Sequence, residues 1–101
     1  MALHLAWSPA AIEDVEAIAA QIERDSPRHA RAVASKLIAA AEAIPEFPEL
    51  GQVVPEGGSA AIRERFGYSY RIIYRIEAQR IVLAAVVHGR RLQASLERIE
   101  G

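Results

Sequence analysis

The sequence contains no cysteine, which removes three classes of site at once. Without a thiol, the chain can form neither a disulfide nor a thiolate zinc site, and it has no thiol nucleophile. A chain without cysteine suits a reducing compartment. We therefore expect the protein to be cytoplasmic.

Long apolar runs are also missing. No run approaches the roughly 20 residues that span a bilayer, and the N-terminus lacks the basic region followed by an apolar core that is typical of an export signal. We expect neither membrane insertion nor secretion. A chain of 101 residues has the usual size of one domain, so we expect a single domain over residues 1–101.

Residues that hold metals or cofactors are scarce. The three histidines, His4, His29 and His88, do not have the spacing of metal ligands on a helix, and no carboxylate pair completes a set. The sequence has neither a glycine loop of the kind that binds phosphates nor a nucleophile elbow. We therefore predict no metal site and no cofactor.

The positive charge is distributed unevenly along the chain. Residues 1–50 carry four basic and eight acidic residues, a difference of −4, whereas residues 51–101 carry eight basic and five acidic residues, a difference of +3. Every basic residue of the second half is an arginine, whose planar guanidinium binds phosphates and carboxylates in a bidentate manner. This charge pattern indicates either a polyanionic or acidic partner or an ordinary solvated surface.

The first half of the chain predicts two helices. Ser8 and Pro9 open one of them, and Ser26 and Pro27 open the other, because serine caps a helix and proline fits its first turn. Apolar residues at helical spacing predict the buried faces, which are Ile12, Val15, Ile18 or Ala19, and Ile22 in the first helix, and Val33, Leu37, Ile38, Ala41 and Ile44 in the second. Their short connection predicts an antiparallel hairpin.

The second half predicts a small sheet. Three extended runs over residues 61–66, 70–77 and 80–88 are joined by connections short enough for hairpins. The opening "LHLAWS" adds a strand beside the last run or its neighbour, and "IPEFPELGQVVPEGGSA" predicts an ordered loop with a short extended piece at 52–54. A short helix over 92–99 can follow. We predict an α+β fold, β-α-α-β-β-β, with the hairpin on one face of a four-stranded, mainly antiparallel sheet.

The run "YRIIYRI" alternates in character along its length. Period two places Tyr70, Ile72, Tyr74 and Ile76 on one face and Arg71, Ile73 and Arg75 on the other. The preceding run places Arg63 and Arg65 opposite Ile62, Glu64 and Phe66. Since the helices should cover the apolar face, we expect Arg63, Arg65, Arg71 and Arg75 to share the open face of the sheet.

Five segments in this order resemble the ParE/RelE superfamily of toxins from type II toxin–antitoxin systems, also called plasmid stabilisation proteins. The segments are "WSPAAIEDVEAI", "FPELG", "IRE", "YRIIYRI" and "VVHGRRL". No single segment is specific, but together they cover nearly the whole chain. The resemblance implies the fold that periodicity predicts.

The resemblance implies one of two activities. RelE-like members are ribosome-dependent endoribonucleases that cut mRNA with basic residues of the sheet and a tyrosine of the final helix. ParE-like members poison DNA gyrase instead. Both kinds form hetero-oligomeric complexes with a small antitoxin whose C-terminal segment wraps the toxin, and such complexes bind their own operator DNA through the antitoxin.

The nuclease reading needs groups that move protons. Arg71 and Arg91 match arginines of the nucleases, but the segment 92–101 contains no tyrosine, and Glu97 falls near the expected place. Arginine is a poor acid–base catalyst because its pKa lies far above neutrality. His88 belongs to a residue type that serves as an acid–base catalyst in many enzymes, although a structural histidine is the commoner case.

We therefore expect a ParE-like toxin that inhibits DNA gyrase by binding and is neutralised by a ParD-like antitoxin, without catalytic residues of its own. Its expected target-binding residues are Arg63, Arg65, Arg71, Arg75, Arg90 and Arg91. The alternative is a RelE-like nuclease that acts on ribosome-bound mRNA, with Arg71, Arg91, His88 and Glu97 as its catalytic residues. A non-toxic protein with a toxin fold, or a plain nucleic-acid-binding domain, is a third possibility.

Overall fold

A computed structural model describes residues 3–89 of the chain. The strand β1 (His4–Trp7) leads into two helices, α1 (Pro9–Glu23) and α2 (Pro27–Ala43). Three short 3-10 helices and a short strand follow: η1 (Ile44–Glu46), η2 (Pro48–Leu50), β2 (Gln52–Val53) and η3 (Pro55–Gly57). The strands β3 (Ile62–Gly67), β4 (Tyr70–Ile76) and β5 (Arg80–His88) complete the described part. The final helix predicted over 92–99 lies outside these residues.

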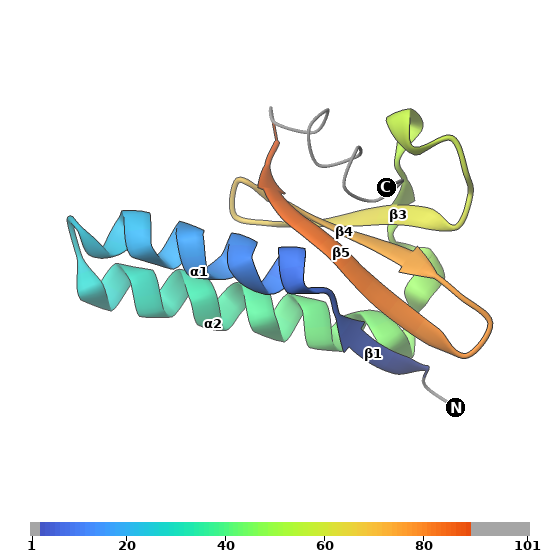
Figure 1. Ribbon diagram of the computed structural model, residues 1–101, viewed down its shortest axis with the longest axis horizontal. Coiled ribbons are helices and arrows are strands. Elements are labelled where there is room, and N and C mark those ends of the chain that lie inside the picture. Colours follow the sequence, from blue (N-terminus) through green and yellow to red (C-terminus); the bar gives the residue numbers. More distant parts are fainter. Residues whose placement is uncertain (1–2, 90–101) are drawn as a thin grey trace.

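The two helices begin where the sequence predicts. The side chain of Ser8 accepts a hydrogen bond of 3.1 Å from the backbone N–H of Ala11, and Ser26 accepts one of 3.1 Å from His29. Each serine thus satisfies a backbone donor of the first turn that has no partner within the helix. The helices form the predicted antiparallel hairpin, and its connecting end extends beyond the sheet (Figure 1).

The sheet has five strands in the order β1-β5-β4-β3-β2. The pairs β2/β3, β3/β4 and β4/β5 are antiparallel, as predicted for runs joined by hairpins, whereas β1 lies parallel to β5. The sheet is therefore mixed and has one strand more than the predicted four, because the short extended piece at Gln52–Val53 pairs with β3. The chain between this parallel pair contains the α-hairpin, the short 3-10 helices and the strands β2 to β4.

The main core lies between the hairpin and one face of the sheet. Tyr74 and Ile72 of β4 are fully buried there against Leu37 and Ala41 of α2. Tyr70 and Tyr74 lie on the helix-covered face that the alternation predicts, and both belong to this cluster, Tyr70 as a partly buried member. A second, smaller cluster lies on the opposite face and contains Val54, Ile62, Ile73, Ala85 and Val87.

Two predicted core positions on the helices are wrong. Ile12 and Ile38 are exposed, while Ala11 and Val15 supply the buried side of the N-terminal half of α1. One residue along a helix corresponds to a rotation of about 100°, so a face centred on Ala11 and Val15 turns Ile12 outward. The sequence pattern favoured the larger side chain, but the small alanine is the one that faces the sheet.

Candidate functional site

Arg71 and Glu64 form a buried ion pair on the sheet face that points away from the helices. Arg71 Nε donates to Glu64 Oε2 at 2.9 Å, and Nη2 of the same guanidinium donates to the same oxygen. The two side chains are 10% and 6% exposed, respectively. Arg71 is on the face that the alternation predicts, but its guanidinium is buried and donates to the carboxylate of Glu64 on the neighbouring strand.

Arg63 and Arg65 do not share that face, so the predicted cluster of four arginines is wrong. The register of β3 and β4 pairs Arg63 with Tyr74 and Arg65 with Ile72, both of which face the helices. Cross-strand partners lie on the same face of a sheet. The alternation along β3 is as predicted, but Ile62, Glu64 and Phe66 take the face of Arg71, since their partners are Arg75, Ile73 and Arg71.

Arg63 and Arg65 instead hold the segment that follows η1. Arg63 Nη1 donates to the carbonyl oxygens of Glu49 and Gly51, each at 3.1 Å, and Arg65 Nη2 donates to that of Phe47 at 2.5 Å. Tyr74 adds a bond from its hydroxyl to the carbonyl oxygen of Pro48 at 2.5 Å. We call residues 47–51 the anchored segment, because four of its five carbonyls accept hydrogen bonds from side chains of β3 and β4.

Gly51 is required where the anchored segment meets Tyr74. A Cβ atom at this position would overlap the Tyr74 hydroxyl and lie 2.9 Å from the carbonyl oxygen of Glu64. Close approach of this kind is a common reason for a glycine in a loop. The segment "FPELG" therefore has a structural role, which sequence reasoning missed.

The remaining described cations are nearer to solvent. Arg75 is on the open face as predicted, with its side chain 38% exposed and its Nη1 3.9 Å from Glu77 Oε2. Glu77 also accepts a hydrogen bond of 2.7 Å from Arg80. Such exposed pairs contribute little to stability. Of the expected target-binding residues, Arg90 and Arg91 lie outside the described residues, as does the nuclease candidate Glu97.

His88 lies on the face opposite Arg71. The register pairs His88 with Tyr70 and Arg71 with Val87, and adjacent residues of a strand point to opposite faces. The rings of His88 and Tyr70 meet edge to face with centroids 5.9 Å apart. The described structure therefore does not bring together these two residues of the nuclease alternative.

Asp14 and Ser8 complete the edge of β5 beyond the end of β1. The backbone N–H of Val86 donates to Asp14 Oδ2 at 2.9 Å, and the Ser8 hydroxyl donates to the carbonyl oxygen of Ala84 at 3.2 Å. Backbone groups of a strand need such partners when no further strand covers them. Both residues therefore attach α1 to the sheet.

Within residues 3–89, the structure shows neither a metal cluster nor a helix that could cross a membrane. In this part of the chain, no three metal-binding side chains lie close enough to hold an ion. None of its helices combines the length and the apolar character that crossing a bilayer requires.

Several solved structures share this fold. A chain of the chromosomal ParDE system from P. aeruginosa aligns with a TM-score of 0.71 and 15% identity, over 85% of this chain and 95% of that chain. The RelBE2 toxin–antitoxin complex from Mycobacterium tuberculosis gives 0.58 and 17%, over 87% and 99%. The YoeB dimer from Staphylococcus aureus gives 0.60 and 15%, over 87% and 98%. At these identities the likeness is one of fold.

Sequence comparison identifies the family. No curated protein sequence matches the chain. The family model described as the ParE toxin of the type II toxin–antitoxin system parDE matches residues 5–93. Since this match spans most of the chain and agrees with the observed fold, the protein belongs to the ParE toxin family of type II toxin–antitoxin systems.

Proposed function

We propose that this toxin inhibits DNA gyrase by binding to it and performs no chemistry on RNA. The observation that carries the proposal is the placement of His88 and Arg71 on opposite faces of β4 and β5. Cleavage of RNA through its 2′-hydroxyl needs a proton acceptor, a proton donor and a cation around one phosphate. A histidine and an arginine separated by the sheet cannot act on the same phosphate.

The other groups near Arg71 also favour binding over catalysis. Glu64 is the carboxylate next to Arg71, but its side chain is buried and engaged by the same guanidinium. Arg63 and Arg65 donate to backbone carbonyls of the anchored segment. These contacts give the arginines of β3 and β4 structural partners within the chain, which a set of phosphate-binding cations would not need.

A ParD-like antitoxin is the second partner in this proposal. The family match to parDE and the likeness to chains from toxin–antitoxin systems support it. The antitoxin would cover apolar surface of the toxin with a helix and an extended segment, since both modes suit a two-layer domain with uncovered rims. It would also supply the contact of the hetero-oligomer with operator DNA. The toxin would act in the cytoplasm, where gyrase works, and would stabilise a plasmid that carries the pair.

A RelE-like nuclease is the alternative function. The specific observation in its favour is that the RelBE2 complex and the YoeB dimer each align over 87% of this chain, against 85% for the ParDE chain, although their TM-scores of 0.58 and 0.60 are lower than 0.71. In that case Arg71, Arg91, His88 and Glu97 would act on ribosome-bound mRNA.

One experiment separates the two functions. The purified toxin is added to gyrase with relaxed plasmid and ATP, and in parallel to a translating extract whose mRNA ends are mapped. The proposal expects loss of supercoiling and intact message. Codon-positioned cuts that disappear in His88→Ala, together with unaffected gyrase, would make the nuclease the correct function.

A further inference from the structure

The anchored segment and the start of β2 present an unusual apolar surface. Phe47, Leu50 and Val53 are 62%, 73% and 43% exposed, and they fall within seven consecutive residues. We call these three side chains the exposed rim. A single exposed apolar residue is ordinary, whereas exposed apolar side chains that gather in one place are a feature of interaction sites.

The backbone that carries the exposed rim is held in place. The bonds from Arg63, Arg65 and Tyr74 turn the carbonyls of the anchored segment toward the sheet. The bonds from Phe47 N–H to Ile44 O and from Leu50 N–H to Phe47 O, each 3.1 Å, fix its two 3-10 turns. A loose loop could fold its apolar side chains inward, whereas this one holds Phe47 and Leu50 outward, which lowers the entropy cost of binding.

The charge around the exposed rim limits the kind of partner. The segment 42–53, which carries the exposed rim, contains the glutamates Glu42, Glu46 and Glu49 and no basic residue, while Arg63 and Arg65 of β3 donate to its backbone carbonyls. Glu42, Glu46 and Glu49 are exposed. Exposed carboxylates repel the phosphates of nucleic acids and attract lysine and arginine side chains. The charge therefore favours a protein partner with a basic margin.

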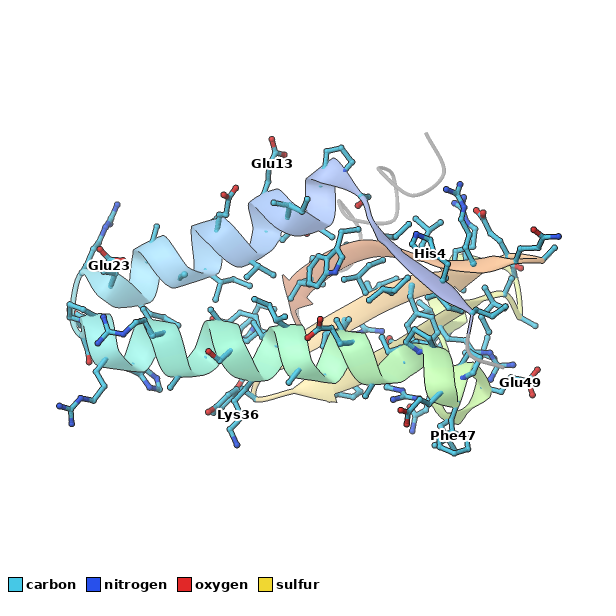
Figure 2. The ribbon with its side chains drawn as sticks, turned by 90° about the horizontal axis from the view of Figure 1, so that it is seen from below. His4, Glu13, Glu23, Lys36, Phe47 and Glu49 are labelled. Atoms are coloured by element: carbon cyan, nitrogen blue, oxygen red, sulfur yellow. The ribbon has the colours of Figure 1, made fainter. Side chains whose placement is uncertain are left out.

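The shape of the surface indicates how that partner binds. Phe47 and Glu49 project outward from the end of the molecule where α2 leads into the short turns (Figure 2). A projecting aromatic side chain fits a pocket of a folded protein, as hot-spot residues do. A segment that folds on binding would need a groove instead.

We propose that the exposed rim is the surface with which the toxin contacts its target protein. Under the function proposed above, on which this inference rests, that target is gyrase. Phe47 and Leu50 enter an apolar pocket on the target, and Glu46 and Glu49 face lysine or arginine side chains around it. The toxin thus recognises its target through an apolar surface with exposed glutamates, and the arginines of β3 hold the backbone that carries this surface.

The test uses purified toxin variants in the gyrase supercoiling assay. Phe47→Ser and Leu50→Ser should each raise the half-inhibitory concentration roughly tenfold, and the double variant more, because each removes an apolar anchor. Ile12→Ser is the matched control, since it removes an exposed isoleucine of α1 far along the chain from the exposed rim. Its inhibition should equal that of the wild type. Circular dichroism should show unchanged folding, because all three side chains are exposed.

The role of the glutamates beside the exposed rim can be tested separately through the rate of association. The double variant Glu46→Lys/Glu49→Lys should associate with gyrase more slowly than the wild type. The difference between the two association rates should shrink as the salt concentration rises, since salt screens exposed charges. Equal inhibition by the wild type and by Phe47→Ser/Leu50→Ser would overturn the inference.

Two other outcomes are distinguishable. If the rim variants keep inhibiting gyrase but escape neutralisation by the antitoxin, the exposed rim is the antitoxin surface and the inference is wrong. If wild-type toxin leaves gyrase active at excess, the proposed function itself fails, and the assignment of gyrase to the exposed rim fails with it.

Discussion

Glu64 of β3 and Arg71 of β4 form a buried ion pair on the sheet face opposite the helices. Their pairing gives Arg71, a predicted residue of both candidate sites, a structural contact within the chain. A buried charge without a partner is costly, so each residue requires the other. The pair therefore predicts effects on stability before any effect on target binding.

Removal of one partner should destabilise the protein strongly. We expect Arg71→Ala or Glu64→Ala to lower the free energy of unfolding by about 3 kcal/mol, because a buried charge is left unpaired. Urea denaturation measures this. The double variant Glu64→Leu/Arg71→Met should recover most of the loss, since it leaves no buried charge. A negligible cost for both single variants would show that the pair does not hold β3 against β4.

The contact between Gly51 and Tyr74 predicts coupling between two variants. Tyr74→Phe should cost about 1 kcal/mol through the lost bond to Pro48. Gly51→Ala should cost more, because its methyl group would overlap the Tyr74 hydroxyl. In the Tyr74→Phe background the cost of Gly51→Ala should fall, and a double-mutant cycle measures the difference. Strictly additive costs would contradict the contact.

Asp14 should matter for stability although it lies on the helix surface. Asp14→Ala leaves the Val86 N–H without its acceptor and should cost about 1 to 3 kcal/mol. Glu13→Ala is the matched control, since Glu13 is the exposed neighbour on the same turn and should change stability little. Hydrogen exchange of the Val86 amide provides a local readout. Equal protection of this amide in both variants would argue against the bond.

Arg63 and Arg65 should control the order of the anchored segment. Arg63→Ala and Arg65→Ala should speed hydrogen exchange and proteolysis within residues 47–51, whereas Arg75→Ala should not. Arg63→Lys should fail to restore protection, because a single ammonium does not reproduce the guanidinium fork that binds two carbonyls. If lysine restores both protection and gyrase inhibition, the charge of Arg63 matters more than its geometry.

The sequence allowed most of the fold to be predicted. Ser8 with Pro9, and Ser26 with Pro27, marked both helix starts, and the alternation of "YRIIYRI" identified the strand face that packs under the helices. Helix caps and strand alternation depend on residues that are close together in the sequence. They can therefore be predicted without knowledge of the tertiary structure. The extra pairing of Gln52–Val53 depended on a distant strand and was predicted only as an extended piece.

The candidate site was harder to predict because it depends on register. Alternation divides β3 into two sets of side chains, but only pairing with β4 decides which set faces the helices. One signal was present in the sequence. Glu64 alternates with Ile62 and Phe66, and a carboxylate in such a row needs a cation on the neighbouring strand, which Arg71 supplies. The carbonyl contacts of Arg63 and Arg65 gave no comparable signal, because backbone acceptors are present at every residue.

The most direct test of the central claim is a titration of gyrase with toxin at known concentrations of both. A toxin that acts by binding should abolish supercoiling only when its concentration approaches that of gyrase, and added antitoxin should restore activity in the same proportion. The account predicts this stoichiometric inhibition. Full supercoiling at a large excess of toxin, with ribosome-bound mRNA cut by toxin at far lower concentrations than the ribosomes, would contradict it.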